Sequence, residues 1–196
     1  MDSNINTSSF KLNRKLAIFL MVFILFGING GCSKTSVPNA EKEKNMKLQT
    51  TIPSSISEEH KELHRQLETA IESGGSTGAA AKIVAERLHS HFKKEEEYAL
   101  PQLGLLTQLA QGKVSQDMRD AITLADRLKA DLPQMLEEHK AIVAALDELE
   151  KAAKSENKPG AVEFTEKLRM HAQNEEEVMY PAAILVGEYL KLRLKE

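Results

Sequence analysis

Two short motifs occur twice in this chain, in the same order and at nearly the same spacing, and this repeat is the strongest constraint on its fold. The first motif is Glu-Glu-His-Lys, at 58–61 and again at 137–140. The second, His-x-x-x-Glu-Glu-Glu with a proline four residues further on, begins at His91 and again at His171. The histidines of the two motifs are 31 residues apart in the first half and 32 apart in the second. We therefore expect two equivalent halves.

Composition and periodicity predict the fold class. Of the 196 residues, 41% are hydrophobic and 28% are charged, which is the balance of a globular domain with a leader. Because no segment alternates apolar and polar residues, we predict an all-α fold. The formal net charge of −3 gives no reason to expect nucleic-acid binding. The single cysteine, Cys32, excludes an internal disulfide and a zinc ribbon.

The first 52 residues are predicted to be a leader followed by a tether. Basic residues precede the apolar run 16–28, which is short for a membrane span but suits a signal-peptide core. Cys32 follows two glycines directly after this core, an arrangement that resembles the lipobox of bacterial lipoproteins, although Asn29 stands where those proteins usually have an apolar residue. We expect a signal peptide at 1–31, lipidation of Cys32 and a flexible polar tether at 32–52.

Two alternatives to lipidation stay open, namely an uncleaved N-terminal anchor and an ordinary signal peptide with a spare thiol. Ser33, rather than an aspartate, follows the cysteine. By the same resemblance this favours the outer membrane. We therefore expect an exported protein on the periplasmic side of the cell envelope, held at the membrane by its N-terminal lipid.

Residues 53–196 are predicted to form a four-helix up-and-down bundle with additional short helices after the second helix and at the C-terminus. Glycines and prolines suggest the boundaries. The four long helices are expected at about 54–73, 77–100, 133–155 and 161–180, and the shorter ones at 103–110, 115–132 and 182–194. Ser55 with Glu58 is a predicted capping box. Pro133 is expected either to begin or to kink the third long helix.

The apolar stripes of these helices contain histidines and glutamates. His91 and Glu95 lie in the stripe of the second helix, and His171 and Glu175 lie in that of the fourth. His60 and His139 occupy the stripes of the first and third helices. Unpaired carboxylates are costly in a core, so this pattern indicates a compensating metal site.

Helical spacing selects the carboxylates that take part. Residues i and i+4 share a helix face, which places Glu95 over His91 and Glu175 over His171. The neighbouring Glu96, Glu97, Glu176 and Glu177 are expected on a solvated face. Four histidines and two carboxylates are too many ligands for one tetrahedral zinc, but they suit two adjacent ions bridged by carboxylates. We expect two iron ions. Manganese is the second choice of metal, and zinc is less suitable.

These residues resemble the hemerythrin-like, or HHE cation-binding, family, whose four-helix bundles hold a carboxylate-bridged di-iron centre. The resemblance covers about 54–181. It implies that His60, His91, His139 and His171 are terminal ligands and that Glu95 and Glu175 are bridges. In oxygen-carrying hemerythrins the third helix supplies another histidine four residues after the first, where this chain has Val143.

The extra histidine of this chain is His64, four residues after His60. It is either a fifth imidazole ligand or a hydrogen-bond donor to a ligand. As a ligand it would, together with His60, fill the coordination sphere of one ion. The other ion, held by His139 and His171, would then keep an open coordination position. Tyr98 and Tyr180 either pack in the core or donate to bound oxygen.

Three function classes are compatible with this sequence. Our choice is a binding or sensing protein whose di-iron site takes dioxygen, nitric oxide or peroxide species, or simply holds iron. The alternative is a di-iron oxidoreductase of peroxidase or catalase type, which needs an open coordination position and a proton donor. Ferritin-like carboxylate bundles need paired Glu-x-x-His motifs, and only Glu86 and His89 fit that spacing. No protein partner is predicted.

Overall fold

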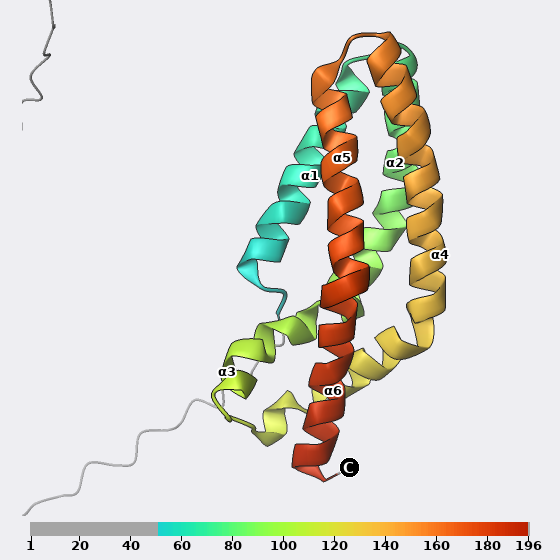
Figure 1. Cartoon of the computed structure of the whole chain (residues 1–196). Helices are drawn as coiled ribbons and strands as arrows, with labels where there is room; N and C mark the ends of the chain where they lie inside the picture. Colours follow the sequence, from blue (N-terminus) through green and yellow to red (C-terminus); the bar gives the residue numbers. More distant parts are fainter. Residues whose placement is uncertain (1–50, 196) are drawn as a thin grey trace, which may run out of the picture. The chain divides into compact units, whose positions relative to one another are not determined.

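The computed structural model describes residues 51–195, and all the regular secondary structure in this range is helical (Figure 1). The predicted signal peptide, the lipidation site Cys32 and the tether up to residue 50 lie outside the described residues. Within 51–195, no helix combines the length and the apolar character needed to cross a membrane.

Four long helices form a bundle, which confirms the predicted all-α fold. They are α1 (Ser54–Glu72), α2 (Gly75–Lys94), α4 (Asp120–Ser155) and α5 (Pro159–Asn174). Shorter helical segments follow α2 and α5, namely η1 (Glu95–Ala99), η2 (Pro101–Leu105), α3 (Leu106–Ala110), η3 (Gln116–Met118), η4 (Glu175–Met179) and α6 (Tyr180–Leu194).

Pro133 lies inside α4, so the helix is continuous where the sequence allowed either a start or a kink. Figure 1 shows α4 changing direction in its lower part, as expected where a proline removes one backbone hydrogen bond. The capping-box prediction is wrong. Pro53 occupies the N-cap position of α1, and no side chain caps this helix.

Each His-x-x-x-Glu motif ends in a π-helical turn, which the sequence did not predict. η1 begins at Glu95 and η4 begins at Glu175, so the two turns occupy equivalent positions in the repeat. The N–H of Leu100 donates to the carbonyl of Glu95 at 3.0 Å, five residues back. After η1 the chain turns into η2. After η4 it continues directly into α6, so the predicted interruption at Pro181 is wrong.

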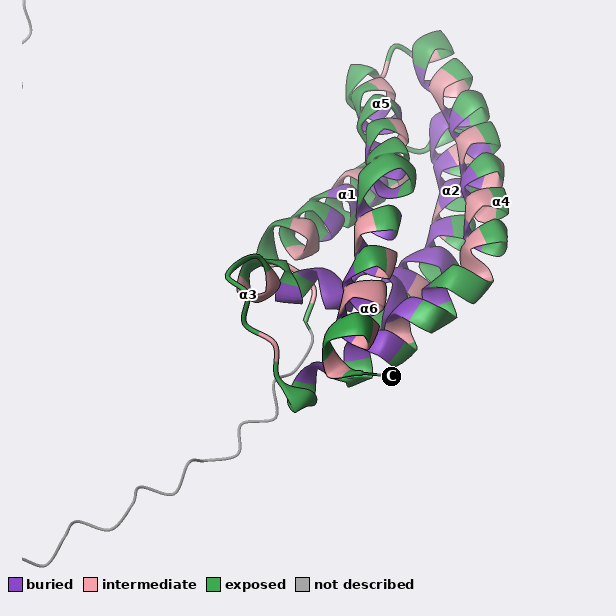
Figure 2. Ribbon diagram, turned by 60° about the horizontal axis from the view of Figure 1, so that its bottom comes forward, coloured by how far each residue is buried: buried purple, intermediate pink, exposed green. Residues whose placement is uncertain are grey.

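A polar layer separates two apolar clusters of the bundle. Along α2, Leu88 belongs to the first cluster and Tyr98, in η1, to the second, with the histidine and glutamate of the motif between them. The same order holds from Leu168 to Met179 along α5 and η4. Figure 2 shows the buried faces of the long helices turned toward one another. The site is therefore held from both sides by packed apolar side chains.

Candidate metal centre

Six of the seven predicted metal-site residues meet in the polar layer. His60 comes from α1, His91 from α2, His139 from α4 and His171 from α5, while Glu95 and Glu175 begin the two π turns. All six residues are at most 2% exposed. Their ligand atoms form two groups able to hold a metal ion. We call them the His60–His171 group and the His91–His139 group, and both contain Glu95 and Glu175.

The oxygens of each carboxylate divide between the two groups. Oε1 of Glu95 lies 2.8 Å from Nε2 of His91, whereas its Oε2 lies 3.7 Å from Nε2 of His60. For Glu175 the arrangement is reversed: Oε1 lies 3.3 Å from Nε2 of His171, and Oε2 lies 3.4 Å from Nε2 of His139. One carboxylate can therefore contact two ions at once, as a bridging ligand does.

The pairing of histidines differs from the expected one. The sequence-based interpretation placed His139 and His171 on the same ion. In the structure His171 is grouped with His60, and His139 is grouped with His91. Each group thus takes one histidine from a Glu-Glu-His-Lys motif and one from a His-x-x-x-Glu motif of the opposite half. Sequence spacing describes positions along one helix and cannot show which helices cross at the site.

Four further glutamates face the outer nitrogens of the histidines. Nδ1 of His91 lies 2.9 Å from Glu138, and Nδ1 of His139 lies 2.8 Å from Glu176. The other two contacts are from His171 to Glu59 at 3.2 Å and from His60 to Glu96 at 3.9 Å. Only the contacts of His91 and His139 are hydrogen bonds, because Nδ1 of His60 and of His171 has no hydrogen-bond partner among the described residues. A carboxylate that accepts from Nδ1 keeps the proton on that nitrogen, which leaves Nε2 free to bind a metal.

This arrangement explains the repeated acidic residues. The glutamate directly before His60 or His139 contacts a histidine of the opposite half. The glutamate directly after Glu95 or Glu175 contacts a histidine of its own half. Glu96 and Glu176 are exposed, as predicted for a solvated face, but each also contacts a site histidine, which was not predicted. The repeat could have revealed these residues, since it preserves the glutamates together with the ligands.

The site strongly favours positive charge. Burial lowers the pKa of the His139 imidazole, but the carboxylates of Glu175 and Glu95 outweigh it and raise this pKa to about 10. Burial also lowers the pKa of His171, and Glu175 raises it to about 9. Burial raises the pKa of the Glu175 carboxyl, yet the surrounding imidazoles hold it well below its usual range. The field that favours these protons also favours a bound cation.

Several buried polar atoms test whether a metal fits. His60, His91 and His171 each have an Nε2 without a hydrogen-bond partner, and so have Oε2 of Glu95 and Oε1 of Glu175. Buried polar atoms are rarely left unpaired, because each costs about 1–3 kcal/mol. These atoms point into the same small volume, and imidazole nitrogens with carboxylate oxygens are suitable ligands for iron. The donor set fits two metal ions.

His64 does not join either group. Its side chain is exposed, and its ring lies edge-on to Phe92 with the centroids 5.0 Å apart. Phe92 in turn stacks on His60 at 4.5 Å, so a phenyl ring is in contact with both imidazoles. This placement does not support a fifth imidazole ligand at His64. Glu86 and His89 are also exposed, which disfavours the ferritin-like arrangement.

The two tyrosines differ in position. Tyr180 is buried and donates from its hydroxyl to Oε1 of Glu95 at 2.7 Å, with Nε2 of His139 at 3.4 Å. Burial and the Glu95 carboxylate raise the pKa of Tyr180 far above its usual range, so its phenol stays protonated. Tyr98 donates instead to Asp131, away from the six residues. Only Tyr180 therefore belongs to the site.

The fold and the site together define a helical bundle with a buried cation-binding centre of histidines and glutamates. Residues 51–183 match the family described as the Hemerythrin HHE cation binding domain. The chain belongs to this family, as its repeated motifs indicated. No curated protein and no solved structure showed significant similarity to it.

Proposed function

We propose that this protein is a non-haem di-iron protein that binds or senses dioxygen, nitric oxide or peroxide species, or holds iron. The observation that carries the proposal is the division of carboxylate oxygens. Each of the two buried glutamates directs one oxygen at an imidazole of the His60–His171 group and the other at an imidazole of the His91–His139 group. A single ion would leave the buried ligand atoms of one group without a compensating cation, whereas two ions bridged by the carboxylates would satisfy both groups.

Two iron ions, when bound, would supply open coordination positions and one-electron chemistry for small ligands. The residues of this chain hold and insulate them. His91 and His139 would present an unprotonated Nε2 to the ions, because Glu138 and Glu176 hold their Nδ1 protons. Tyr180 donates a hydrogen bond to Oε1 of Glu95 and thereby orients that carboxylate. The apolar clusters above and below the site exclude bulk water.

The alternative function is a di-iron oxidoreductase of peroxidase or catalase type. One observation favours it, namely the buried hydroxyl of Tyr180 beside Glu95 and His139, which is placed as a proton donor. Turnover of hydrogen peroxide that is lost in Tyr180→Phe, with iron content unchanged, would select this alternative. A turnover that is low and equal in both proteins would favour binding or sensing.

The location at the cell envelope is inferred from the leader sequence. The apolar run, the glycines and Cys32 support export and lipidation, and the tether would then place the metal domain on the periplasmic side of the outer membrane. Membrane fractionation and mass spectrometry of the mature N-terminus test this. A cytosolic protein with an intact Met1 would overturn it.

The test of the metal proposal is iron analysis of the purified protein. We expect two iron ions per chain, and fewer in Glu95→Ala and Glu175→Ala because each change removes a bridge. Glu97→Ala is the matched control, since this exposed glutamate lies two residues after Glu95 outside both groups. One tightly held zinc ion per chain, unaffected by either bridge substitution, would contradict the proposal.

A further inference from the structure

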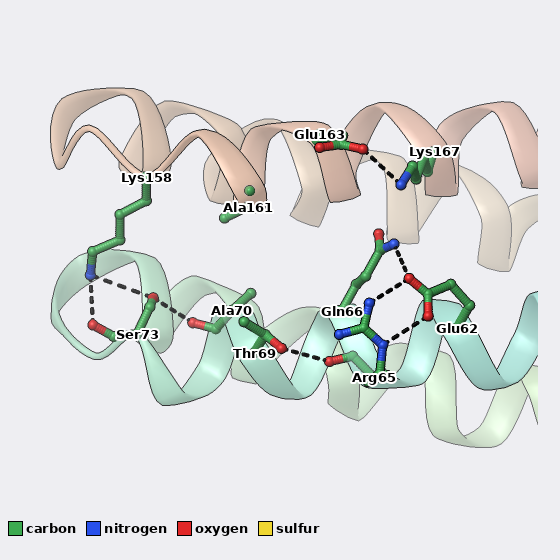
Figure 3. Close-up of a pocket in the computed structure, with 11 residues that line it drawn as sticks. Glu62, Arg65, Gln66, Thr69, Ala70, Ser73, Lys158, Ala161, Glu163 and Lys167 are labelled. Carbon is green, nitrogen blue, oxygen red and sulfur yellow. Dashed lines mark hydrogen bonds and ion pairs between the residues drawn. The ribbon is translucent and has the colours of Figure 1, made fainter. Parts of the chain in front are cut away.

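A groove between α1 and α5 leads to the metal centre. One hollow of about 460 Å³ lies toward the loop that joins α4 to α5 and is drawn in Figure 3, where Gln66 on α1 points toward α5 and Lys167 on α5 points toward α1. A second hollow of about 490 Å³ is lined by Glu59 and His171. Both are lined by Gln66 and Lys167, so the two hollows adjoin at these side chains.

The other histidine of this group also borders a hollow. His60 lines a separate volume of about 400 Å³ together with Glu96 and Pro101. Both histidines of the His60–His171 group therefore lie at the inner edge of open space, although each is at most 2% exposed. A small displacement of the side chains at this edge would connect the group to solvent.

The repeat shows why the two halves of the site differ here. The position equivalent to Gln66 is Ala145, which is buried in the first apolar cluster. The position equivalent to Glu62, another residue of the groove, is Ala141. The hollow that Ala145 borders, between α2 and α4, is smaller, about 200 Å³, and no site histidine lines it. The longer polar side chains on α1 line a wider groove that reaches His171.

The outer glutamates of the two halves are held differently. Glu138 receives hydrogen bonds from Lys94 at 2.7 Å and from Gln134 at 3.2 Å in addition to its contact with His91, and it is 23% exposed. The position equivalent to Lys94 is Asn174. Within residues 51–195, the carboxylate of Glu59 has one partner, His171, and is 47% exposed. Glu59 can therefore leave its histidine more easily than Glu138.

The ligand atoms of the two groups also differ in their hydrogen bonds, and again the His91–His139 group is held more firmly. In the His91–His139 group, the Tyr180 hydroxyl contacts both Glu95 and His139. The position equivalent to Tyr180 is Leu100, which cannot make such contacts. All four ligand atoms of the His60–His171 group, namely Nε2 of both histidines, Oε2 of Glu95 and Oε1 of Glu175, lack a hydrogen-bond partner.

We infer that small ligands reach the His60–His171 group through the groove between α1 and α5, and that Glu59 controls their access as a positioning residue at its inner end. This inference rests on the proposed di-iron function. It also assigns different roles to the two groups. The His91–His139 group, which Lys94, Glu138 and Tyr180 close off, would hold its ion without exchanging external ligands.

Stopped-flow binding of nitric oxide to the reduced, iron-loaded full-length protein tests this inference. Nitric oxide is uncharged, so changes of side-chain charge do not steer it electrostatically. Asn174→Lys places a lysine where it can hold Glu59 as Lys94 holds Glu138, and we expect association to slow about threefold or more, the range of a partly exposed ion pair. Glu59→Ala should have the opposite effect and accelerate association.

Gln173→Lys is the matched control, because it adds the same charge on the adjacent residue, which is exposed and does not line the groove. Its association rate should equal that of the parent. Iron content is measured in every variant. Equal rates in the parent, Asn174→Lys and Glu59→Ala, with two irons in each, would overturn the inference and leave the di-iron function intact. A parent that binds neither iron nor nitric oxide would overturn both.

Discussion

Replacing Glu138 by alanine should weaken metal binding without removing any ligand. Glu138 accepts the Nδ1 proton of His91 at 2.9 Å and is itself held by Lys94 and Gln134. Without this carboxylate the His91 ring loses its fixed orientation and the group that makes its Nε2 a better donor. Glu138→Ala should therefore act on the ion of the His91–His139 group through its histidine.

The size of the effect follows from these contacts. A hydrogen bond to a charged group contributes about 1.5–3 kcal/mol, and the exposed quarter of Glu138 places this case at the low end of the range. About 1.5 kcal/mol corresponds to roughly tenfold in affinity. Carboxylates that orient metal-bound histidines typically change affinity by about 10–100-fold, which agrees with this value. Glu138→Gln keeps an acceptor but loses the charge, so its effect should be smaller.

Competition with a chelator of known affinity measures this change. Glu137→Ala is the matched control, because this adjacent glutamate is exposed and pairs with Lys140 on the surface. We expect parental affinity for Glu137→Ala and roughly tenfold weaker binding for Glu138→Ala, with a similar helical content by circular dichroism. Equal affinities for the two alanine variants would refute the orienting role of Glu138.

Three further outcomes are expected. Chelation should lower the melting temperature, and the difference between the metal-bound and metal-free proteins should widen as pH rises from about 6.5 to about 10. The raised pKa values of His171, about 9, and His139, about 10, stabilise the metal-free fold through imidazolium charge that is lost over this range, whereas metal-bound imidazoles carry no such proton. A pH-independent difference would contradict this. His64→Ala should leave the iron content and the visible spectrum unchanged, and a loss of iron would show that this exposed histidine is a ligand after all. Gly187→Ala should destabilise the fold by about 1–3 kcal/mol in urea unfolding, because the added Cβ would lie 2.3 Å from a side chain on α4. Gly160→Ala, whose Cβ meets nothing within 4 Å, should be nearly neutral in the same assay.

The π turns show a limit of helical periodicity. Counting in steps of 3.6 residues predicted an ordinary helix through each motif, yet a wider turn begins at Glu95 and at Glu175. A proline lacks the N–H that a regular helix would use, and a π turn before it changes the hydrogen-bonding pattern in advance. The sequence contains the cause, in Pro101 and Pro181. Whether the chain then turns aside or continues helical depends on what it packs against.

The sequence by itself determined the helical fold, the inward faces of the helices and the set of residues from which the site is built. These features are local, because the spacing of apolar residues, His91 and Glu95 along one helix fixes which of them share a face. Tertiary structure alone decided the rest. It grouped His60 with His171, brought Glu96 and Glu176 into contact with site histidines, placed His64 outside the site and left a groove that borders His171 between α1 and α5. The physical reason is that such contacts join different helices, and their geometry depends on the crossing of those helices and on the size of every side chain packed between them.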